Sequence, residues 1–208
     1  MHNIRYLKVC GMKDLKNIQD LAVLPIQYVG HIFYSKSPRY AEPLEPWESP
    51  SSIKKTGVFV NATLDEISAY IKQFNLRAIQ LHGNESPTLC AQIQQENVEV
   101  IKAFGIHEKF DWSILKTYQP AVDYFLFDTR SDHFGGTGKT FGWENLRNYP
   151  LDTPYFLSGG LSLENLEEAL AFQDERLVGL DLNSRFEVSP GIKDIEKIKL
   201  ALKVINHE

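Results

Sequence analysis

The chain is poor in cysteine and methionine, and it has no long hydrophobic run and no excess of positive charge. Only two of its 208 residues are cysteine and two are methionine. Two cysteines are too few for a disulfide scaffold, and Cys10 and Cys90 lack the spacing of a metal-binding motif. The longest apolar runs have the length of β-strands and fall far short of a membrane span. We therefore expect no membrane insertion, no disulfide framework and no structural metal site.

The net charge and the N-terminal residues further restrict the possible binding partners and the cellular location. The formal net charge is −5, which argues against nonspecific nucleic-acid binding because such binding needs an excess of basic residues. A local cluster of cations can still bind an anionic small molecule. The N-terminus, MHNIRYLKVCGM, lacks the apolar core of a signal peptide. A cytoplasmic location is therefore expected.

Eight short apolar runs alternate with stretches of helical spacing. Most runs are near-continuous, which is typical of parallel strands covered on both faces. The runs are Tyr6–Cys10, Tyr28–Phe33, Gly57–Val60, Ala78–Leu81, Val98–Phe104, Tyr124–Phe127, Tyr155–Leu157 and Leu177–Leu182. Strict alternation predicts an α/β fold with right-handed crossovers. Eight units favour a closed (β/α)8 TIM barrel, a single domain over residues 1–208, and a doubly wound open sheet is the alternative.

The segments between the runs carry signals for helices. Thr63 and Glu66 form a capping box, and Ser86 precedes a proline at the first helical position. Ser162 is the expected N-cap of the helix after the seventh run. The stretch Ala41–Ser52 holds three prolines, so it predicts a loop with at most a short helix. The stretch after the sixth run also supports only a short helix.

The C-terminal ends of the strands are where a barrel of this kind carries its active site. At these ends each apolar run breaks into polar residues or glycine. The positions are Cys10, residues 33–40, Asn61, His82–Gly83, Asp128, Gly159–Gly160 and Asn183–Ser184. Their shared place in the repeat predicts that they surround one site.

Cys10 ends the first run, in KVCGM. Cysteine is often simply buried and inert, but the position at the predicted rim favours a catalytic role here. Lys8 has the same strand parity, so both side chains are expected to face the barrel interior. A nearby ammonium group would favour the thiolate. Cys90 lies in a predicted helix and is interpreted as structural.

Asp128 ends the sixth run, and Arg39 lies in the loop after the second run. An aspartate after a strand is most often a loop cap, yet this one lies across a ring of eight from the first strand. An acid and a base on opposite sides of a substrate need such a separation, and burial favours the proton-donating form of a carboxyl group. The loop FYSKSPRY is either a plain surface loop or a cationic site, whose Arg39 suits a planar carboxylate.

Glycine-rich segments follow the sixth and seventh runs. Gly159 and Gly160 let the backbone approach a ligand, and loops after strands seven and eight form the usual phosphate site of such barrels. Asn183 and Ser184 follow the eighth run. The segment FGGTGKTFGW, residues 134–143, matches neither a Walker loop nor the dinucleotide fingerprint. We interpret it as a mobile lid, with a structural turn as the alternative.

Taken together, these motifs resemble one family. KVCGM, VGHIFYSKSPRY, GVFVN, IQLHGNES, IKAF, FLFDT, GGTGKTF, LSGGLSLENL and LDLNSRFEVSPGIKD are similar, in order, to the signatures of phosphoribosylanthranilate isomerase, and they span nearly the whole chain. The resemblance implies an Amadori rearrangement of N-(5′-phosphoribosyl)anthranilate to 1-(2-carboxyphenylamino)-1-deoxyribulose 5-phosphate, in tryptophan biosynthesis. It implies no metal and no organic cofactor. The expected partner is the phosphorylated substrate, with the chain a monomer or a homodimer.

The resemblance also implies roles for individual residues. Asp128 matches the general acid that protonates the ribose ring oxygen, and Cys10 matches the general base that removes the C2 proton. Arg39 matches the arginine that binds the anthranilate carboxylate. Other residues match the phosphate-binding loops or line the pocket: Gly159, Gly160, Asn183 and Ser184 in the first group, and Asn61, Gln80 and His82 in the second.

Three positions depart from the family pattern, and three other functions compete with it. Gly142 stands where aspartate is common, Arg185 where glycine is common, and His31 where an apolar residue is usual; none of these removes a catalytic group. The histidine-pathway isomerase uses an aspartate in place of Cys10. Indole-glycerol-phosphate synthase relies on a lysine acid and a longer N-terminus. A catalytically silent metabolite-binding barrel would need neither Cys10 nor Asp128.

Overall fold

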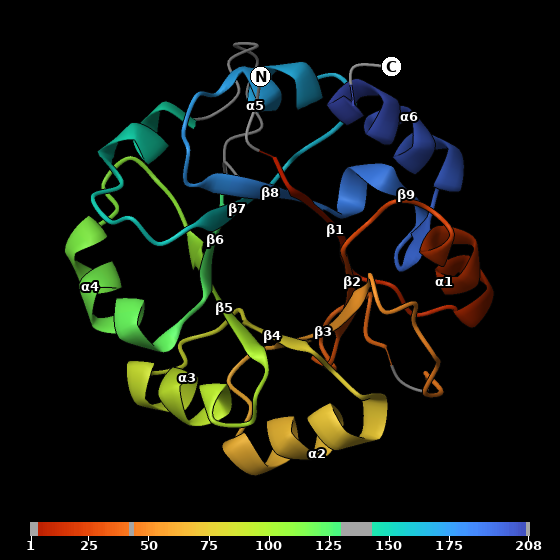
Figure 1. The fold of residues 1–208 in the computed structure, drawn as a ribbon, viewed down its shortest axis with the longest axis horizontal. Coiled ribbons are helices and arrows are strands. Elements are labelled where there is room, and N and C mark those ends of the chain that lie inside the picture. Colours follow the sequence, from red (N-terminus) through yellow and green to blue (C-terminus); the bar gives the residue numbers. More distant parts are fainter. Residues whose placement is uncertain (1–3, 42–43, 130–142, 207–208) are drawn as a thin grey trace.

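Eight parallel strands close into a barrel in which each strand pairs with the next along the chain and β8 pairs with β1. The computed structural model describes residues 4–41, 44–129 and 143–206. Figure 1 looks down the barrel and shows the strands as a central ring with the helices outside it. The strands are β1 Tyr6–Val9, β2 Tyr28–Ile32, β3 Lys54–Phe59, β4 Ala78–Leu81, β5 Glu99–Gly105, β6 Tyr124–Asp128, β7 Tyr155–Ser158 and β8 Leu177–Leu182. The predicted TIM barrel is confirmed, and the open doubly wound sheet is excluded.

The helices that surround the barrel are uneven in length. They are α1 Leu15–Ala22, α2 Leu64–Phe74, α3 Pro87–Gln94, α4 Leu115–Tyr118, α5 Leu166–Ala171 and α6 Ile195–Asn206. Short 3-10 turns occupy η1 Trp112–Ile114, η2 Gln119–Ala121, η3 Trp143–Asn148 and η4 Ser184–Phe186, and a small antiparallel hairpin pairs β9 Glu187–Ser189 with β10 Ile192–Lys193. The described part of the proline-rich connection from β2 to β3 forms no helix. None of the described helices is long and apolar enough to cross a membrane.

Sequence motifs predicted the first residues of α2 and α3 correctly and the start of α5 wrongly. The Thr63–Glu66 capping box is present at α2, and the Ser86 side chain accepts a hydrogen bond from the backbone of α3. Ser162 does not cap the next helix, because α5 begins only at Leu166. Instead, Asn165 accepts from the Ser162 amide at 2.8 Å and donates to the Gly160 carbonyl at 3.0 Å. These two bonds hold the chain in a loop where the sequence pattern predicts a helical turn.

The barrel interior changes from aromatic to polar along its axis. Toward the N-terminal ends of the strands, the rings of Tyr6, Tyr28, Tyr124 and Phe156 pack against one another at centroid distances of 5.3–6.1 Å. Further along the strands, next to the apolar Leu126 of β6, lie polar side chains that share the inward face. They are Lys8, Asp181, Ser158 and Gln80, all buried. The aromatic plug closes one end of the barrel, so a ligand has to bind at the polar end.

The third strand is longer than its apolar run. The run predicts a start at Gly57, but β3 begins at Lys54, because Lys54 and Thr56 pair in register with Tyr28 and Gly30 of β2. Lys54 forms an ion pair with Glu99 and donates to the Tyr28 hydroxyl at 3.3 Å. The early residues of the strand were missed because their polar side chains are satisfied by partners inside the barrel, which a hydrophobicity pattern cannot show.

His31 connects three segments near the C-terminal ends of β1 and β2. Its Nδ1 lies 2.8 Å from the Met12 carbonyl, and its Nε2 accepts a hydrogen bond from the Trp47 indole at 3.1 Å. The bond from Trp47 leaves Nδ1 as the protonated nitrogen, so the ring is neutral. Full burial lowers the pKa of His31 to about 4. His31 therefore acts as a neutral structural bridge.

The His31 bridge predicts a loss of stability in mild acid. The unfolded chain binds a proton at His31 with a pKa near 6.5 and the folded chain only near 4, so stability is present above pH 6.5 and falls between those values. The free energy of unfolding should drop by about 2 kcal/mol more in the wild type than in His31→Gln between pH 7 and 4.5. Urea denaturation at the two pH values measures it. Equal drops in both proteins would contradict the bridge.

Candidate active site

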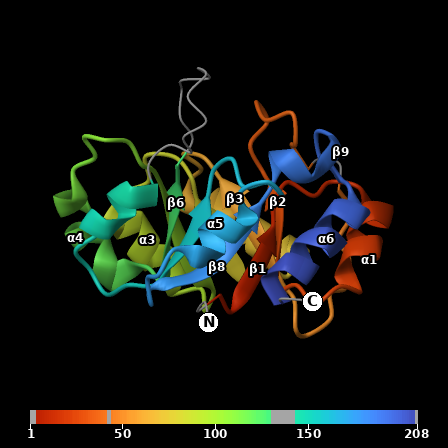
Figure 2. The same ribbon diagram turned by 90° about the horizontal axis from the view of Figure 1, so that it is seen from above.

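Cys10 lies directly after β1 at the polar end of the barrel and is 3% exposed. Figure 2 shows the barrel from the side, with β9, which follows β8, toward the upper right of the view. The Cys10 amide donates to the Leu182 carbonyl at 2.9 Å, which fixes it between β1 and β8. On its other side lies Gly30, where a Cβ atom would meet the Cys10 Sγ at 2.8 Å. The absent side chain of Gly30 makes the space for the thiol.

Burial and the neighbouring charges act in opposite directions on the Cys10 thiol. Burial raises the pKa of the Cys10 thiol, and the nearby Lys8 and Lys193 ammonium groups oppose that rise without cancelling it. Lys8 is held by Asp181 at 2.8 Å, with both side chains buried. The prediction that Lys8 lies beside Cys10 in the interior and favours its thiolate is confirmed, but burial of the thiol outweighs the effect of Lys8.

Polar side chains line the barrel from Lys8 on β1 to Asp128 on β6. Asp181 accepts from Lys8 through Oδ1 and from the Ser158 hydroxyl through Oδ2 at 3.2 Å. Ser158 of β7 lies in register with Asp128 at the end of β6. The Asp128 side chain is 10% exposed, and its Oδ2 lies 3.8 Å from Nε2 of His82. The structure therefore brings the rim residues of β1, β8, β7, β6 and β4 into one continuous lining.

Gln80 and His82 complete this lining on β4. Gln80 Nε2 lies 2.8 Å from His82 Nδ1. Burial lowers the pKa of His82, while the carboxylate of Asp128 opposes that effect. The neutral ring accepts from Gln80 at Nδ1 and directs its Nε2–H toward Asp128. Among the described residues, Gln80 Oε1 is a buried acceptor without a hydrogen-bond partner, which leaves it available to a ligand.

Asn61 contributes to the shape of the rim more than to its lining. It has a left-handed backbone, with φ of 54°. Its side-chain oxygen accepts from the Asn84 amide at 2.7 Å, and its own amide donates to Glu85 Oε1 at 2.7 Å. Glu85 is buried against Lys102 at 3.2 Å. The Glu85–Lys102 pair, which sequence reasoning missed, thus ties the loops after β3 and β4 together; the polar residues of IQLHGNES and IKAF were its only signal.

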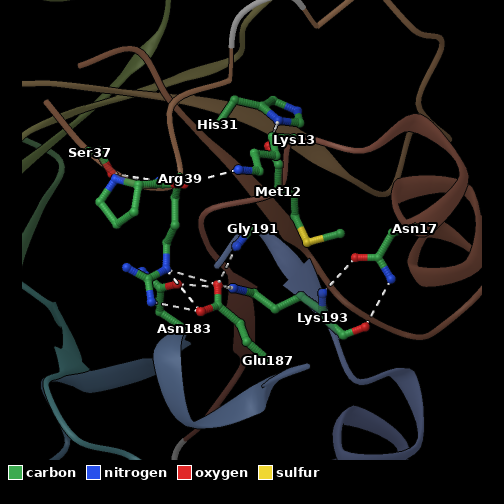
Figure 3. Close-up of polar contacts among 11 residues, drawn as sticks. Met12, Lys13, Asn17, His31, Ser37, Arg39, Asn183, Glu187, Gly191 and Lys193 are labelled. Atoms are coloured by element: carbon green, nitrogen blue, oxygen red, sulfur yellow. Dashed lines mark hydrogen bonds and ion pairs between the residues drawn. The ribbon is translucent and has the colours of Figure 1, made fainter. Parts of the chain in front are cut away.

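Arg39 is held in place by a carboxylate that sequence reasoning did not single out. Figure 3 shows its guanidinium facing Glu187 of β9. Nε donates to both carboxylate oxygens at 2.9 and 3.0 Å, and Nη2 donates to Oε2 at 2.7 Å. Lys193 of β10 donates to the same carboxylate at 2.5 Å. Both residues lie within LDLNSRFEVSPGIKD, but spacing alone did not show that they turn back toward Arg39.

The loop after β7 is built on two glycines with left-handed backbone. Gly159 and Gly160 adopt φ of 92° and 69°, a region that residues with a Cβ rarely enter. A Cβ at Gly160 would meet no atom within 4 Å, so the backbone there borders open space. Asn183 accepts from Lys193 at 2.9 Å, and Ser184 begins η4. Residues 134–142 of the predicted lid lie outside the described residues.

Comparison with known proteins identifies the family. The family model for N-(5′-phosphoribosyl)anthranilate (PRA) isomerase matches residues 7–204. The N-(5′-phosphoribosyl)anthranilate isomerase of Parabacteroides distasonis is 45% identical over 206 residues, covering 97% of this chain and 93% of that protein. The chain belongs to the phosphoribosylanthranilate isomerase family. It is therefore an isomerase of tryptophan biosynthesis.

Solved structures of the family share the whole fold. The crystal structure of phosphoribosyl anthranilate isomerase from Thermotoga maritima matches with a TM-score of 0.83 and 33% identity, covering 98% of this chain and 99% of that one. A second family structure, in complex with reduced 1-(o-carboxyphenylamino)-1-deoxyribulose 5-phosphate, matches with a TM-score of 0.81 and 30% identity over the same shares. Among the described residues of our chain, no group of three or more His, Cys, Asp or Glu side chains is arranged to hold a metal ion.

The packing of Gly30 against Cys10 predicts the effect of one added methyl group. In Gly30→Ala the new Cβ would lie 2.8 Å from Sγ and 3.1 Å from Cα of Cys10, so the thiol has to move. Overpacking of this kind costs about 1–3 kcal/mol, and displacement of a reacting group should lower kcat/KM by about tenfold or more. Gly105→Ala, whose Cβ would meet nothing within 4 Å, is the stability control. Full activity of Gly30→Ala would show that the position of Sγ is unimportant.

Proposed function

We propose that the chain performs an Amadori rearrangement of N-(5′-phosphoribosyl)anthranilate, with Asp128 as general acid and Cys10 as general base. The observation that carries this proposal is the continuous polar lining that joins the rim positions of β1, β8, β7 and β6 in one buried layer. A substrate that fills the polar end of the barrel contacts the thiol on one side and the carboxyl group on the other. Family membership supports the same reaction.

The two anionic groups of the substrate orient it between the catalytic groups. The phosphate binds at the backbone of Gly159 and Gly160 and beside Asn183 and Ser184, and the anthranilate carboxylate binds Arg39. Holding both ends fixes the ribose at the reacting groups, which is how orientation lowers a barrier. A family member in complex with a reduced carboxyphenylamino deoxyribulose phosphate supports a ligand of this shape.

The reaction then proceeds by ring opening followed by proton transfers that convert the Schiff base into the ketone. Asp128 gives its proton to the ribose ring oxygen as the C1–O bond breaks, which opens the ring to a Schiff base. Cys10 removes the proton from C2, and the electron pair moves toward nitrogen to give an enolamine. The enolamine gains a proton at C1 and loses the one on the C2 oxygen, which yields the ketone. Each positioned proton transfer typically contributes about 10²–10⁴-fold in rate.

The environment of Cys10 suits a base that removes a carbon-bound proton. Burial raises the pKa of the thiol, which reduces the thiolate population and makes the thiolate that does form a stronger base. Lys8 and Lys193 act in the opposite direction and keep that population from vanishing. The His82 Nε2 lies 3.8 Å from Asp128 Oδ2, so the imidazole borders the acid. Gln80 Oε1 offers an acceptor to the sugar hydroxyls.

The partner and location predictions follow from the same substrate. A phosphorylated, charged metabolite does not cross membranes, so we place the enzyme in the cytoplasm beside its supply. A monomer or a homodimer is expected, and a relative from Thermotoga maritima is described as dimeric. A reaction that consists only of proton transfers needs no metal and no organic cofactor.

The test is the loss of phosphoribosylanthranilate fluorescence on adding purified enzyme. Cys10→Ser and Asp128→Asn should each lower kcat by about 10²-fold or more with substrate still bound, because each removes a proton-transfer group and leaves the phosphate and carboxylate contacts intact. Cys90→Ser, the other buried cysteine, is the matched control and should keep wild-type turnover. Near wild-type kcat in either rim variant would refute its role.

A further inference from the structure

The group around Arg39 combines two cations with one buried carboxylate. Glu187 accepts from Arg39 and from Lys193, and its Oε1 also accepts from the Gly191 amide at 3.1 Å. The Glu187 and Lys193 side chains are 4% and 0% exposed, and Arg39 is 19% exposed. Burial alone would raise the pKa of Glu187, but the hydrogen bonds from Arg39 and Lys193 hold it below its ordinary value. The carboxylate is therefore ionised, and it offsets one of the two cations.

This arrangement poses a problem for binding a substrate carboxylate. Arg39 turns two of its nitrogens, Nε and Nη2, toward Glu187 in a bidentate ion pair. An arginine paired in this way with a single carboxylate is electrically neutral overall, and a second carboxylate gains little from approaching it. Glu187 fixes the orientation of the guanidinium but, taken alone, would cancel the charge that the substrate needs.

Lys193 resolves this problem because it compensates Glu187. Its ammonium group donates to Glu187 Oε1 at 2.5 Å and to Asn183 Oδ1 at 2.9 Å. Its backbone is clamped on both sides by Asn17 of α1, which donates to the Lys193 carbonyl at 2.9 Å and accepts from its amide at 2.7 Å. Lys193 is thus held at both its backbone and its ammonium group, and the two cations of the group exceed the single carboxylate by one positive charge.

All of these side chains converge over Gly11, the residue after Cys10. Gly11 has φ of 80°, and a Cβ there would meet Arg39 Cδ at 2.8 Å, Asn183 Oδ1 at 2.9 Å and Lys193 Nζ at 3.5 Å. Figure 3 shows Arg39, Asn183, Glu187 and Lys193 as one connected set. The uncompensated charge therefore lies at the rim, beside the proposed base.

We infer that Lys193 is a specificity-determining residue: by neutralising Glu187 it leaves the oriented Arg39 guanidinium a net positive charge for the carboxylate of an aromatic amine. This inference rests on the proposed function, in which Arg39 binds that carboxylate. Glu187 sets which edge of Arg39 faces the substrate, and Lys193 sets whether that edge attracts an anion.

The test compares two substrates that differ only in the carboxylate. N-(5′-phosphoribosyl)anthranilate carries it and N-(5′-phosphoribosyl)aniline does not. The quantity measured is the ratio of kcat/KM for the first substrate to kcat/KM for the second. Any effect of Lys193 on Cys10 is shared by both substrates and cancels in this ratio, whereas a role in carboxylate recognition does not.

Lys193→Met makes the Arg39–Glu187 group neutral, so the ratio should fall by about tenfold or more, the size expected for losing one charge-assisted contact. Glu187→Gln combined with Lys193→Met restores a net positive charge at Arg39 without the lysine. The ratio of this double variant should return to within about threefold of wild type. Lys199→Met, on the exposed face of α6, is the control for removing a lysine and should leave the ratio unchanged. Circular dichroism and thermal melts confirm that each variant is folded.

The outcomes separate this inference from the proposed function. An unchanged ratio in Lys193→Met, or a double variant whose ratio stays as low as that of Lys193→Met, overturns the role of Lys193. Arg39→Met is measured alongside, and an unchanged ratio there overturns the assignment of Arg39 as the carboxylate ligand. If Arg39→Met lowers the ratio and Lys193→Met does not, the proposed function stands and only the inference on Lys193 fails.

Discussion

The closure of the barrel between its first and last strands is the constraint on which the site depends. β1 and β8 pair over four residues, and Lys8 and Asp181 face each other in that register as a buried ion pair at 2.8 Å. Removing either partner would leave an uncompensated buried charge, which is strongly destabilising. Cys10 directly follows the paired residues of β1, and Asn183 directly follows those of β8. Asp181 also accepts from Ser158, so the same carboxylate extends the connection toward Asp128.

Where β1 meets β8, burial raises the pKa of the Cys10 thiol and the neighbouring ammonium groups lower it. Near the contact between β1 and β8 the barrel buries the Cys10 thiol, the ammonium groups of Lys8 and Lys193, and carboxylates that include Asp181. Every ammonium near Cys10 is already paired, Lys8 with Asp181 and Lys193 with Glu187. Burial nevertheless outweighs both ammonium groups and leaves the pKa of the Cys10 thiol above its ordinary value.

The sequence predicts the fold and most rim positions because both depend on local pattern. Eight apolar runs in strict alternation with helices predict the barrel, and the C-terminal end of each run places Cys10, Asp128 and His82 at one rim. Partners distant in the chain could not be predicted in this way. Glu187 meets Arg39 across 148 positions and Asp181 meets Lys8 across 173, and no periodicity records such contacts. The rise in the pKa of the Cys10 thiol could not be predicted for the same reason, since its burial depends on segments distant in the chain.

We propose Cys10 as the general base and Asp128 as the general acid, and a kinetic isotope effect tests this assignment most directly. With substrate deuterated at C2 of the ribose, removal of that atom limits turnover only where the base is impaired. The account predicts that deuteration slows Cys10→Ser clearly and leaves Asp128→Asn unaffected, because ring opening limits the latter. An isotope effect in Asp128→Asn and none in Cys10→Ser would contradict the assignment of base and acid.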